Sequence, residues 1–178
     1  KSKQYSTGAI QLVLDNIERA VKDPDEVSRV GMARAAHLSG KAINIAQTTA
    51  CHAISYPITS YFDVPHGHAV VLTLPQMTVF NSEVQEEDCI DKRGVKYVQE
   101  TMQSLIELLG VKNVMEAHDK LQGIVESVGL EITLSSLGIQ NEQDRNTILT
   151  NGFNPGRMKN NPRQVTEDVL RSMLEKIQ

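Results

Sequence analysis

The chain is 178 residues long, which suits one domain or one large lobe of a larger protein. Hydrophobic residues make up 40% of the chain and charged residues 22%, so we expect a packed core and exclude global disorder. The net charge of -4 and the pI near 5.7 leave no broad basic surface, which argues against a nucleic-acid partner and against binding to anionic membranes.

The cysteine content and the hydropathy favour a protein of a reducing compartment. Cys51 and Cys89 are too few for a disulfide framework, so we expect a cytoplasmic protein in which both thiols are small packed groups. No stretch approaches the roughly 18 to 20 apolar residues of a membrane helix. The first five residues contain no Met and no signal-peptide core and lead directly into a helical pattern, so we interpret the chain as part of a longer protein.

Helix-period patterning dominates the first third of the chain. Apolar residues recur at three- and four-residue steps over residues 9–21 and predict a first amphipathic helix. The sequence Asp23-Pro24-Asp25 is expected to end it and to cap the next helix. A long Ala-rich helix is predicted over residues 26–53. Pro57 and Pro65 are expected to set the short segment between them off from its neighbours.

Helical patterning continues to the C-terminus. Pro75 is expected to bend the first of the remaining helices, and Gly110 and Gly129 to end the second and third. These helices are predicted over residues 66–80, 95–109, 114–128, 141–150 and 166–177. No segment alternates as a strand would, and no repeat is present. The predicted fold class is therefore all-α, a multi-helix domain of about eight helices.

The long predicted helix carries polar residues along one face. At 100° per residue, a stripe of five polar side chains spans only about 80°, whereas the other faces carry small and apolar residues. The stripe consists of His37, Lys41, Asn44, Thr48 and His52. We expect such a helix to be buried on most sides and to line a polar cavity with Lys41, Asn44 and Thr48. A solvated face is the alternative interpretation.

Two histidines are candidates for metal ligands. His52 and His66 lie fourteen positions apart, and the prolines between them allow their imidazoles to converge from different helices. Neutral imidazole suits Fe, Zn, Ni or Cu, and a mixed histidine and carboxylate set suits Fe(II) or Zn in particular. Taken alone, two histidines are weak evidence. Of the other three, His37 is expected to make a structural hydrogen bond, His68 to lie partly exposed at a helix N-terminus, and His118 to lie at the surface.

Several motifs then resemble the signature of the iron-containing (group III) alcohol dehydrogenase family. They are Gly40-Lys41-Ala42-Ile43-Asn44, His52-Ala53, Tyr56-Pro57 and Val64-Pro65-His66-Gly67-His68-Ala69. The tail, Asn160-Asn161-Pro162-Arg163 followed by Thr166, Asp168 and Leu170, is similar to that family's C-terminal segment. The resemblance runs from Tyr5 to the end, and the spacing from His52 to the Pro-His-Gly motif makes it specific.

The resemblance implies a fold, a ligand set and cofactors. Residues 1–178 would form the helical metal-binding and substrate domain of the dehydroquinate synthase-like type, with His52 and His66 as the family's third and fourth metal ligands. The other two ligands, an Asp and a His, and the nucleotide-binding domain are expected upstream of Lys1. The chain alone is therefore expected to be inactive and to bind metal weakly. The implied cofactors are Fe²⁺, with Zn²⁺ or Ni²⁺ as alternatives, and NAD(P), held mainly by the upstream domain.

The implied activity is NAD(P)-dependent interconversion of a small alcohol and an aldehyde. The metal would act as a Lewis acid on the substrate oxygen, and the nicotinamide would carry the hydride. Many members have a further histidine four residues after the third ligand. Here that position is Tyr56, a candidate catalytic residue whose hydroxyl could donate a hydrogen bond. The expected partners are the small substrate, the chain's own N-terminal nucleotide-binding domain and further copies in a homo-oligomer.

The substrate class and two alternative functions stay open. Residues 40–44, 55–61 and 154–163 look closest to the branch of the family that reduces phosphonoacetaldehyde. A dianionic substrate needs cationic donors, which Lys41 and the basic cluster Arg157, Lys159 and Arg163 could supply. A plain short-chain alcohol would need none of them. The alternatives are a zinc-dependent relative of glycerol dehydrogenase or dehydroquinate synthase, and a non-catalytic helical binding module in which His52 and His66 are structural.

Overall fold

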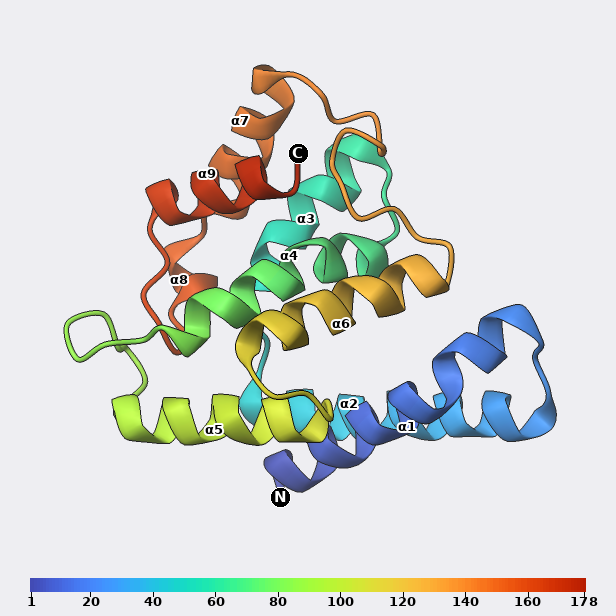
Figure 1. Ribbon diagram of the computed structural model, residues 1–178. Helices are drawn as coiled ribbons and strands as arrows, with labels where there is room; N and C mark the ends of the chain where they lie inside the picture. Colours follow the sequence, from blue (N-terminus) through green and yellow to red (C-terminus); the bar gives the residue numbers. More distant parts are fainter. The chain divides into compact units, whose positions relative to one another are not determined.

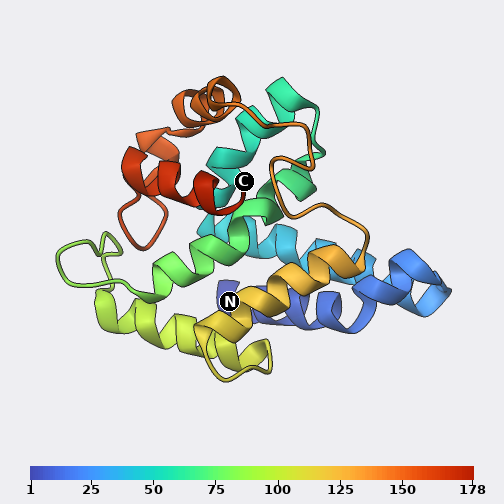
Figure 2. The same cartoon turned by 45° about the horizontal axis from the view of Figure 1, so that its top comes forward.

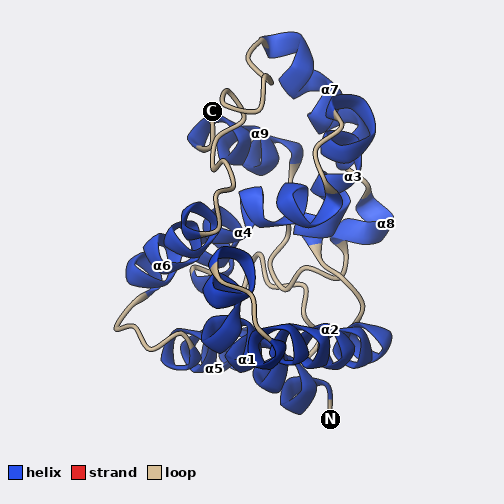
Figure 3. Ribbon diagram, turned by 90° about the vertical axis from the view of Figure 1, so that its right-hand side faces the viewer, coloured by secondary structure: helices blue, strands red, loops and turns tan.

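The computed structural model describes residues 1–178 and contains helices and loops but no strand (Figures 1 and 3). The predicted all-α fold is confirmed, and the one bridge of strand type joins Cys89 to Arg163. No helix combines the length and the apolar character that a membrane crossing requires. The helices are α1 (Ser2–Lys22), α2 (Glu26–Ala46), α3 (Ala50–Phe62), α4 (His66–Ser82), α5 (Val95–Leu108), α6 (Val114–Ser127), α7 (Glu142–Gly152), α8 (Pro155–Met158) and α9 (Glu167–Lys176).

The helices form two compact units, each with its own packing. The first unit comprises residues 1–48 and 127–129, and the second comprises residues 49–126 and 130–178. Both candidate metal ligands belong to the second unit, whereas the rest of the predicted polar stripe belongs to the first.

In the first unit, α1 and α2 lie side by side and antiparallel (Figures 1 and 2). Ser2 Oγ donates to the carbonyl oxygen of Ala42 at 3.2 Å, which fixes one end of the pair. Near the other end Gly31 approaches Asn16 so closely that a Cβ there would lie 2.5 Å from its side chain. The predicted cap is confirmed, because the carboxylate of Asp25 accepts from the backbone N–H of Ser28 at 2.8 Å.

The prediction of one helix over residues 26–53 is wrong. The α2 helix ends at Ala46, and Gln47 has φ of 63°, which is incompatible with an α-helix. Thr49 then adopts the extended backbone of an N-cap residue before α3. The two successive β-branched threonines have low helix propensity, which favours a break at this point. His52 therefore lies on α3 and does not share a helix with Lys41, Asn44 and Thr48.

The expectation that this polar helix is buried on most sides is also wrong. The buried positions of α2 are Ser28, Gly31, Ala35 and Ala42. Lys41 and Asn44 are exposed, and so are the apolar residues Ile43 and Ile45. The small residues of α2 thus serve close packing against α1 along one face only.

Pro57 and Pro75 lie inside helices, whereas Pro65 is the N-cap residue of α4 and separates it from α3, as expected. The α3 helix continues through Pro57 and α4 through Pro75, so the expected boundary at Pro57 is wrong. Pro57 is buried, and a Cβ added to Gly152 would lie 3.2 Å from its Cγ. Close packing against the end of α7 therefore compensates for the hydrogen bond that a proline cannot donate. The turn after α3 is made by Asp63, whose φ is 56°.

The second unit holds the main hydrophobic core. The C-terminal helices α7 to α9, orange to red in Figures 1 and 2, gather on α3 and α4. Apolar side chains from these helices and from the loop before α7 are almost completely shielded from solvent. They include Ile54, Ile58, Leu72, Met77, Leu134, Ile139, Ile148, Leu170 and Leu174. Val84, Val95 and Val98 form a smaller cluster beside α5.

Buried polar groups connect the end of α4 to the segment before α9. Asn161 is 1% exposed, and its amide nitrogen donates to Asn81 Oδ1 at 2.8 Å and to the carbonyl oxygen of Arg163 at 2.7 Å. Arg163 donates to Asp88 and to the carbonyl oxygen of Phe80, each at 2.7 Å. These bonds hold the chain that leads into α9 against the rest of the core.

The buried amide of Asn161 gives a test of this packing. In Asn161→Ala, the side chain of Asn81 and the carbonyl of Arg163 lose a buried partner, so we expect the free energy of unfolding to fall by about 1–3 kcal/mol. Urea denaturation monitored by circular dichroism measures the change. Gln99→Ala, at an exposed position of α5, is the control and should stay within about 0.5 kcal/mol of the parent. Equal losses in both variants would contradict the assignment.

Candidate functional site

The structure brings the two candidate metal ligands together. His52 lies in the first turn of α3 and His66 is the first residue of α4, and their ring centroids are 5.6 Å apart at an interplanar angle of 61°. Two imidazoles that bind one metal ion at about 2.0–2.1 Å have centroids roughly 5–6 Å apart. The separation of the rings therefore fits a shared ion.

A buried serine fixes the orientation of His66. Ser55 is fully buried on α3, and its Oγ donates to the carbonyl oxygen of His52 at 2.8 Å. The same oxygen lies 3.2 Å from Nδ1 of His66. Because the hydroxyl hydrogen is already donated to His52, we assign the hydrogen of this second bond to Nδ1. The Nε2 atom of a neutral His66 then carries a free lone pair, which is what a metal ligand needs.

The electrostatics of the pair also suit ligation. Partial burial, and after it the neighbouring His66, lower the pKa of His52, so the neutral form of this imidazole persists to lower pH. Metal binding requires this form. No group of three or more His, Cys, Asp or Glu side chains in the chain could hold a metal ion. The donors present therefore fit half of a four-ligand site.

Tyr56 extends the site on the exposed side of α3. Its ring centroid lies 5.6 Å from that of His66, and 44% of the residue is exposed. The guanidinium carbon of Arg157 lies 4.2 Å from the Tyr56 ring centroid. The Tyr56 hydroxyl has no hydrogen-bond partner within the chain and can donate to a bound molecule. Imidazole, phenol and guanidinium groups thus follow one another across α3, α4 and α8.

Lys41, Asn44 and Thr48 are not brought to the histidines within either unit. All three belong to the unit of α1 and α2. Lys41 is exposed, and its ammonium group lies 5.6 Å from the ring centroid of Tyr5. Their contact with a substrate stays a prediction. In the basic cluster, Arg163 is bound to Asp88 and Phe80, which leaves Arg157 and Lys159 accessible.

The other histidines and the cysteines have structural roles or none. His68 is buried and its Nε2 bonds the carbonyl oxygen of Glu131 at 2.6 Å, so it is structural, although it is not at the surface as its place near the helix start suggested. The His118 side chain is 12% exposed and bonds Gln76 at 2.8 Å, which corrects its interpretation as a surface residue. Burial raises the pKa of the Cys51 thiol to about 11, so Cys51 is not a nucleophile.

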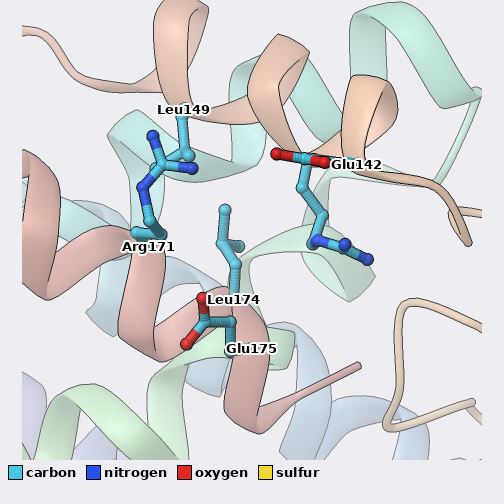
Figure 4. Close-up of a pocket in the computed structure, with 6 residues that line it drawn as sticks. Glu142, Leu149, Arg171, Leu174 and Glu175 are labelled. Atoms are coloured by element: carbon cyan, nitrogen blue, oxygen red, sulfur yellow. The ribbon is translucent and has the colours of Figure 1, made fainter.

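A small hollow elsewhere in the second unit is not an alternative candidate for a ligand site. It lies between α7 and α9 and has a volume of about 80 Å³ (Figure 4). Its two lining arginines are engaged already, since Arg171 donates to Asn146 and Glu167, and Arg145 donates to Gln178. The volume is below the 300–1,000 Å³ typical of ligand pockets, and no histidine lines it.

Ser55 is the residue of this site for which no role was predicted from the sequence. The one available signal was a small polar side chain on an apolar helix, three residues after His52.

Replacing Ser55 by Ala removes the acceptor of Nδ1–H. We therefore expect His66 to lose its preference for the Nδ1–H tautomer, as measured by ¹⁵N chemical shifts of the imidazole ring in the neutral state. Ser60→Ala, at an exposed position of the same helix, should leave these shifts unchanged. Unchanged shifts in Ser55→Ala would refute the assigned bond.

Comparison with known proteins places this geometry in a family. Residues 3–178 match the model of the Fe-containing alcohol dehydrogenase family, C-terminal. The chain is 31% identical over 175 residues to the phosphonoacetaldehyde reductase of Streptomyces viridochromogenes, covering 98% of this chain and 43% of that protein. It is 25% identical over 171 residues to the NADPH-dependent butanol dehydrogenase of Clostridium saccharobutylicum, covering 94% of this chain and 42% of that protein. The chain thus spans less than half the length of these relatives.

Solved structures share the fold. The sulfoacetaldehyde reductase of Bifidobacterium kashiwanohense, solved in complex with NAD+, matches with a TM-score of 0.80 and 25% identity over 99% of this chain and 43% of that one. An archaeal halo-thermophilic alcohol dehydrogenase from a Red Sea brine pool matches with a TM-score of 0.84 and 24% identity over 99% of this chain and 44% of that one. The helical fold, the converging histidines and the family match agree, and the chain belongs to the Fe-containing alcohol dehydrogenase family, whose C-terminal region it matches.

Proposed function

We propose that the whole protein carrying this chain is a metal-dependent, NAD(P)-linked alcohol dehydrogenase or aldehyde reductase. The convergence of His52 and His66, with Nε2 of His66 kept free by Ser55, is the observation that carries the proposal. A bound metal ion would act as a Lewis acid on the oxygen of the alcohol or aldehyde. The chain alone supplies two neutral donors, so we propose that it is inactive and binds metal weakly.

The residues around the histidines have distinct parts in this proposal. His52 and His66 would hold the metal ion as neutral imidazoles, and Ser55 keeps the His66 ring in the orientation that ligation would need. Tyr56 is the candidate catalytic residue of this chain. Its hydroxyl has no partner, and its ring lies beside His66, so it is placed to donate a hydrogen bond to the substrate oxygen.

The substrate proposed is a short aldehyde that carries a phosphonate group. The phosphonoacetaldehyde reductase with 31% identity and the sulfoacetaldehyde reductase with the same fold both have names that indicate a small aldehyde with a tetrahedral anionic group. Lys41, Asn44 and Thr48 are proposed to line the substrate cavity of the whole protein.

We also propose the cofactors, the assembly and the location of the whole protein. Iron(II) is the proposed metal, because imidazole together with carboxylate suits Fe(II), with Zn²⁺ or Ni²⁺ as alternatives. NAD(P) would be held mainly by a nucleotide-binding domain of the whole protein. The two free cysteines are consistent with a cytoplasmic protein, and the homo-oligomer stays a prediction.

Metal content and activity of the whole protein test the proposal. We expect about one iron or zinc ion per chain and NAD(P)H-dependent reduction of short aldehydes. In His52→Ala and His66→Ala each, loss of one ligand should remove most of the bound metal and lower kcat/KM by at least about 100-fold, because affinity depends on the assembled ligand set. The measurements are elemental analysis and cofactor absorbance during turnover.

A matched variant separates the ligand role from loss of the fold. His118→Gln removes an imidazole of the same unit that bonds Gln76 and should keep metal and activity. Circular dichroism of every variant shows whether the helices persist. A folded, metal-free and inactive parent protein would refute the dehydrogenase proposal and favour a helical binding module.

A further inference from the structure

Arg157 is the one arginine of its unit whose guanidinium group has no protein acceptor. The other four each donate to a carboxylate, amide or carbonyl oxygen: Arg93, Arg145, Arg163 and Arg171. Arg157 is exposed, and its guanidinium contacts only the face of Tyr56. Five N–H donors in a planar fork therefore remain available, and this fork matches the oxygens of a phosphonate or carboxylate.

The local packing fixes the place of this guanidinium relative to the histidine pair. At the end of α7, Gly152 lies so close to α3 that an added Cβ would be 3.4 Å from Cα of Ile54. One residue earlier, Asn151 accepts a hydrogen bond from the Tyr61 hydroxyl at 3.2 Å. The short segment that leads to Arg157 is therefore held against α3. The contact with Tyr56 then pre-orients the guanidinium, which lowers the entropic cost of binding an anion.

The charge of the surrounding elements favours an anion at this place. The α3 and α4 helices contain no Asp or Glu, and neither does the segment 151–166. The same segment carries Arg157, Lys159 and Arg163, of which only Arg163 is neutralised by carboxylates. A ligand between Tyr56 and Arg157 would thus meet positive charge without a competing carboxylate.

From this arrangement we infer that Arg157 is the residue that recognises the anionic headgroup of the substrate, with Tyr56 between the headgroup and the metal-binding histidines. The inference rests on the proposed function and adds the residue that recognises the substrate: the guanidinium fork would bind the tetrahedral oxyanion of the short aldehyde through charge-assisted hydrogen bonds. Arg157 is a specificity-determining residue, and it takes no part in proton or hydride transfer.

Comparing a charged aldehyde with an uncharged one separates recognition of the headgroup from the chemical step in the whole protein. For Arg157→Met we expect kcat/KM to fall by about 10- to 100-fold with phosphonoacetaldehyde, the loss typical of hydrogen bonds to a charged group. With propionaldehyde, which is uncharged and of similar length, kcat/KM should stay within about twofold. Methylphosphonate should inhibit the parent competitively against the aldehyde and should inhibit Arg157→Met at least about 10-fold more weakly.

Two matched variants complete the design. Lys92→Met removes the same charge from an exposed position of the same unit, outside the helices that carry the histidines and Arg157, and should leave both substrates unaffected. Arg157→Lys keeps the charge and loses the fork, so it should recover only part of the preference for the anionic aldehyde.

The other outcomes overturn the inference. An equal loss with both aldehydes in Arg157→Met would make the residue structural. A rise in the KM of NAD(P)H at unchanged aldehyde KM would assign the guanidinium to a cofactor phosphate. A parent protein that reduces neither aldehyde would refute the proposed function itself, whereas a parent that reduces both equally well would refute only the role of Arg157.

Discussion

The candidate site depends on the hydroxyl group of Ser55, because this group connects the start of α3 with the start of α4. It donates to the carbonyl oxygen of His52 and accepts from Nδ1 of His66, and it has no contact with solvent. A buried hydroxyl must satisfy its hydrogen bonds within the protein, so the ring of His66 cannot move away from α3 without removing the donor that Ser55 Oγ accepts. The same bond determines which nitrogen of His66 is free. One interaction thus sets both the spacing and the chemistry of the pair.

This interaction holds only because the helices around it pack closely. The α3 helix continues through Pro57 and is covered at this place by Gly152, where a side chain would collide with the proline ring. The apolar residues on either side of Ser55, among them Ile54 and Ile58, are completely buried. A helix that is hydrophobic on most faces and carries one polar face is typical of an element that supports a site. In this unit that element is α3, and it supplies His52, Ser55 and Tyr56.

The sequence predicted the fold class and the convergence of His52 and His66 better than it predicted the course of the backbone. Periodicity located α4 and most later helices within a few residues, because amphipathic patterns depend on the core that each helix faces. It located the end of α1 but not its start at Ser2. The break at Gln47 was missed, since Ala-rich segments on both sides favour one continuous helix and a single residue with positive φ leaves little trace. A helix boundary was predicted at Pro57, but α3 continues through this residue because packing against Gly152 outweighs the helix-breaking preference of proline. These errors share one cause, because tertiary contacts decide where local propensity is ambiguous. The convergence of His52 and His66 was predicted from the two prolines between them; the rings do meet, although only Pro65 lies between the helices and Pro57 lies inside α3. The role of Ser55 could not be predicted, because it depends on how α3 and α4 approach each other.

The charge of the elements around the histidine pair has a consequence for the chemistry. Two neutral imidazoles add no negative charge to a metal site, and α3, α4 and the segment 151–166 contain no carboxylate. In the proposed whole protein, these elements would not reduce the positive charge of a divalent ion, and Arg157 would add to it. Such an environment would stabilise the negative charge that develops on an oxygen atom during oxidation of an alcohol or reduction of an aldehyde. It would also attract an anionic headgroup from solution. The lack of carboxylates that leaves His52 and His66 an incomplete ligand set is thus the same feature that would make their surroundings receptive to the proposed anionic aldehyde.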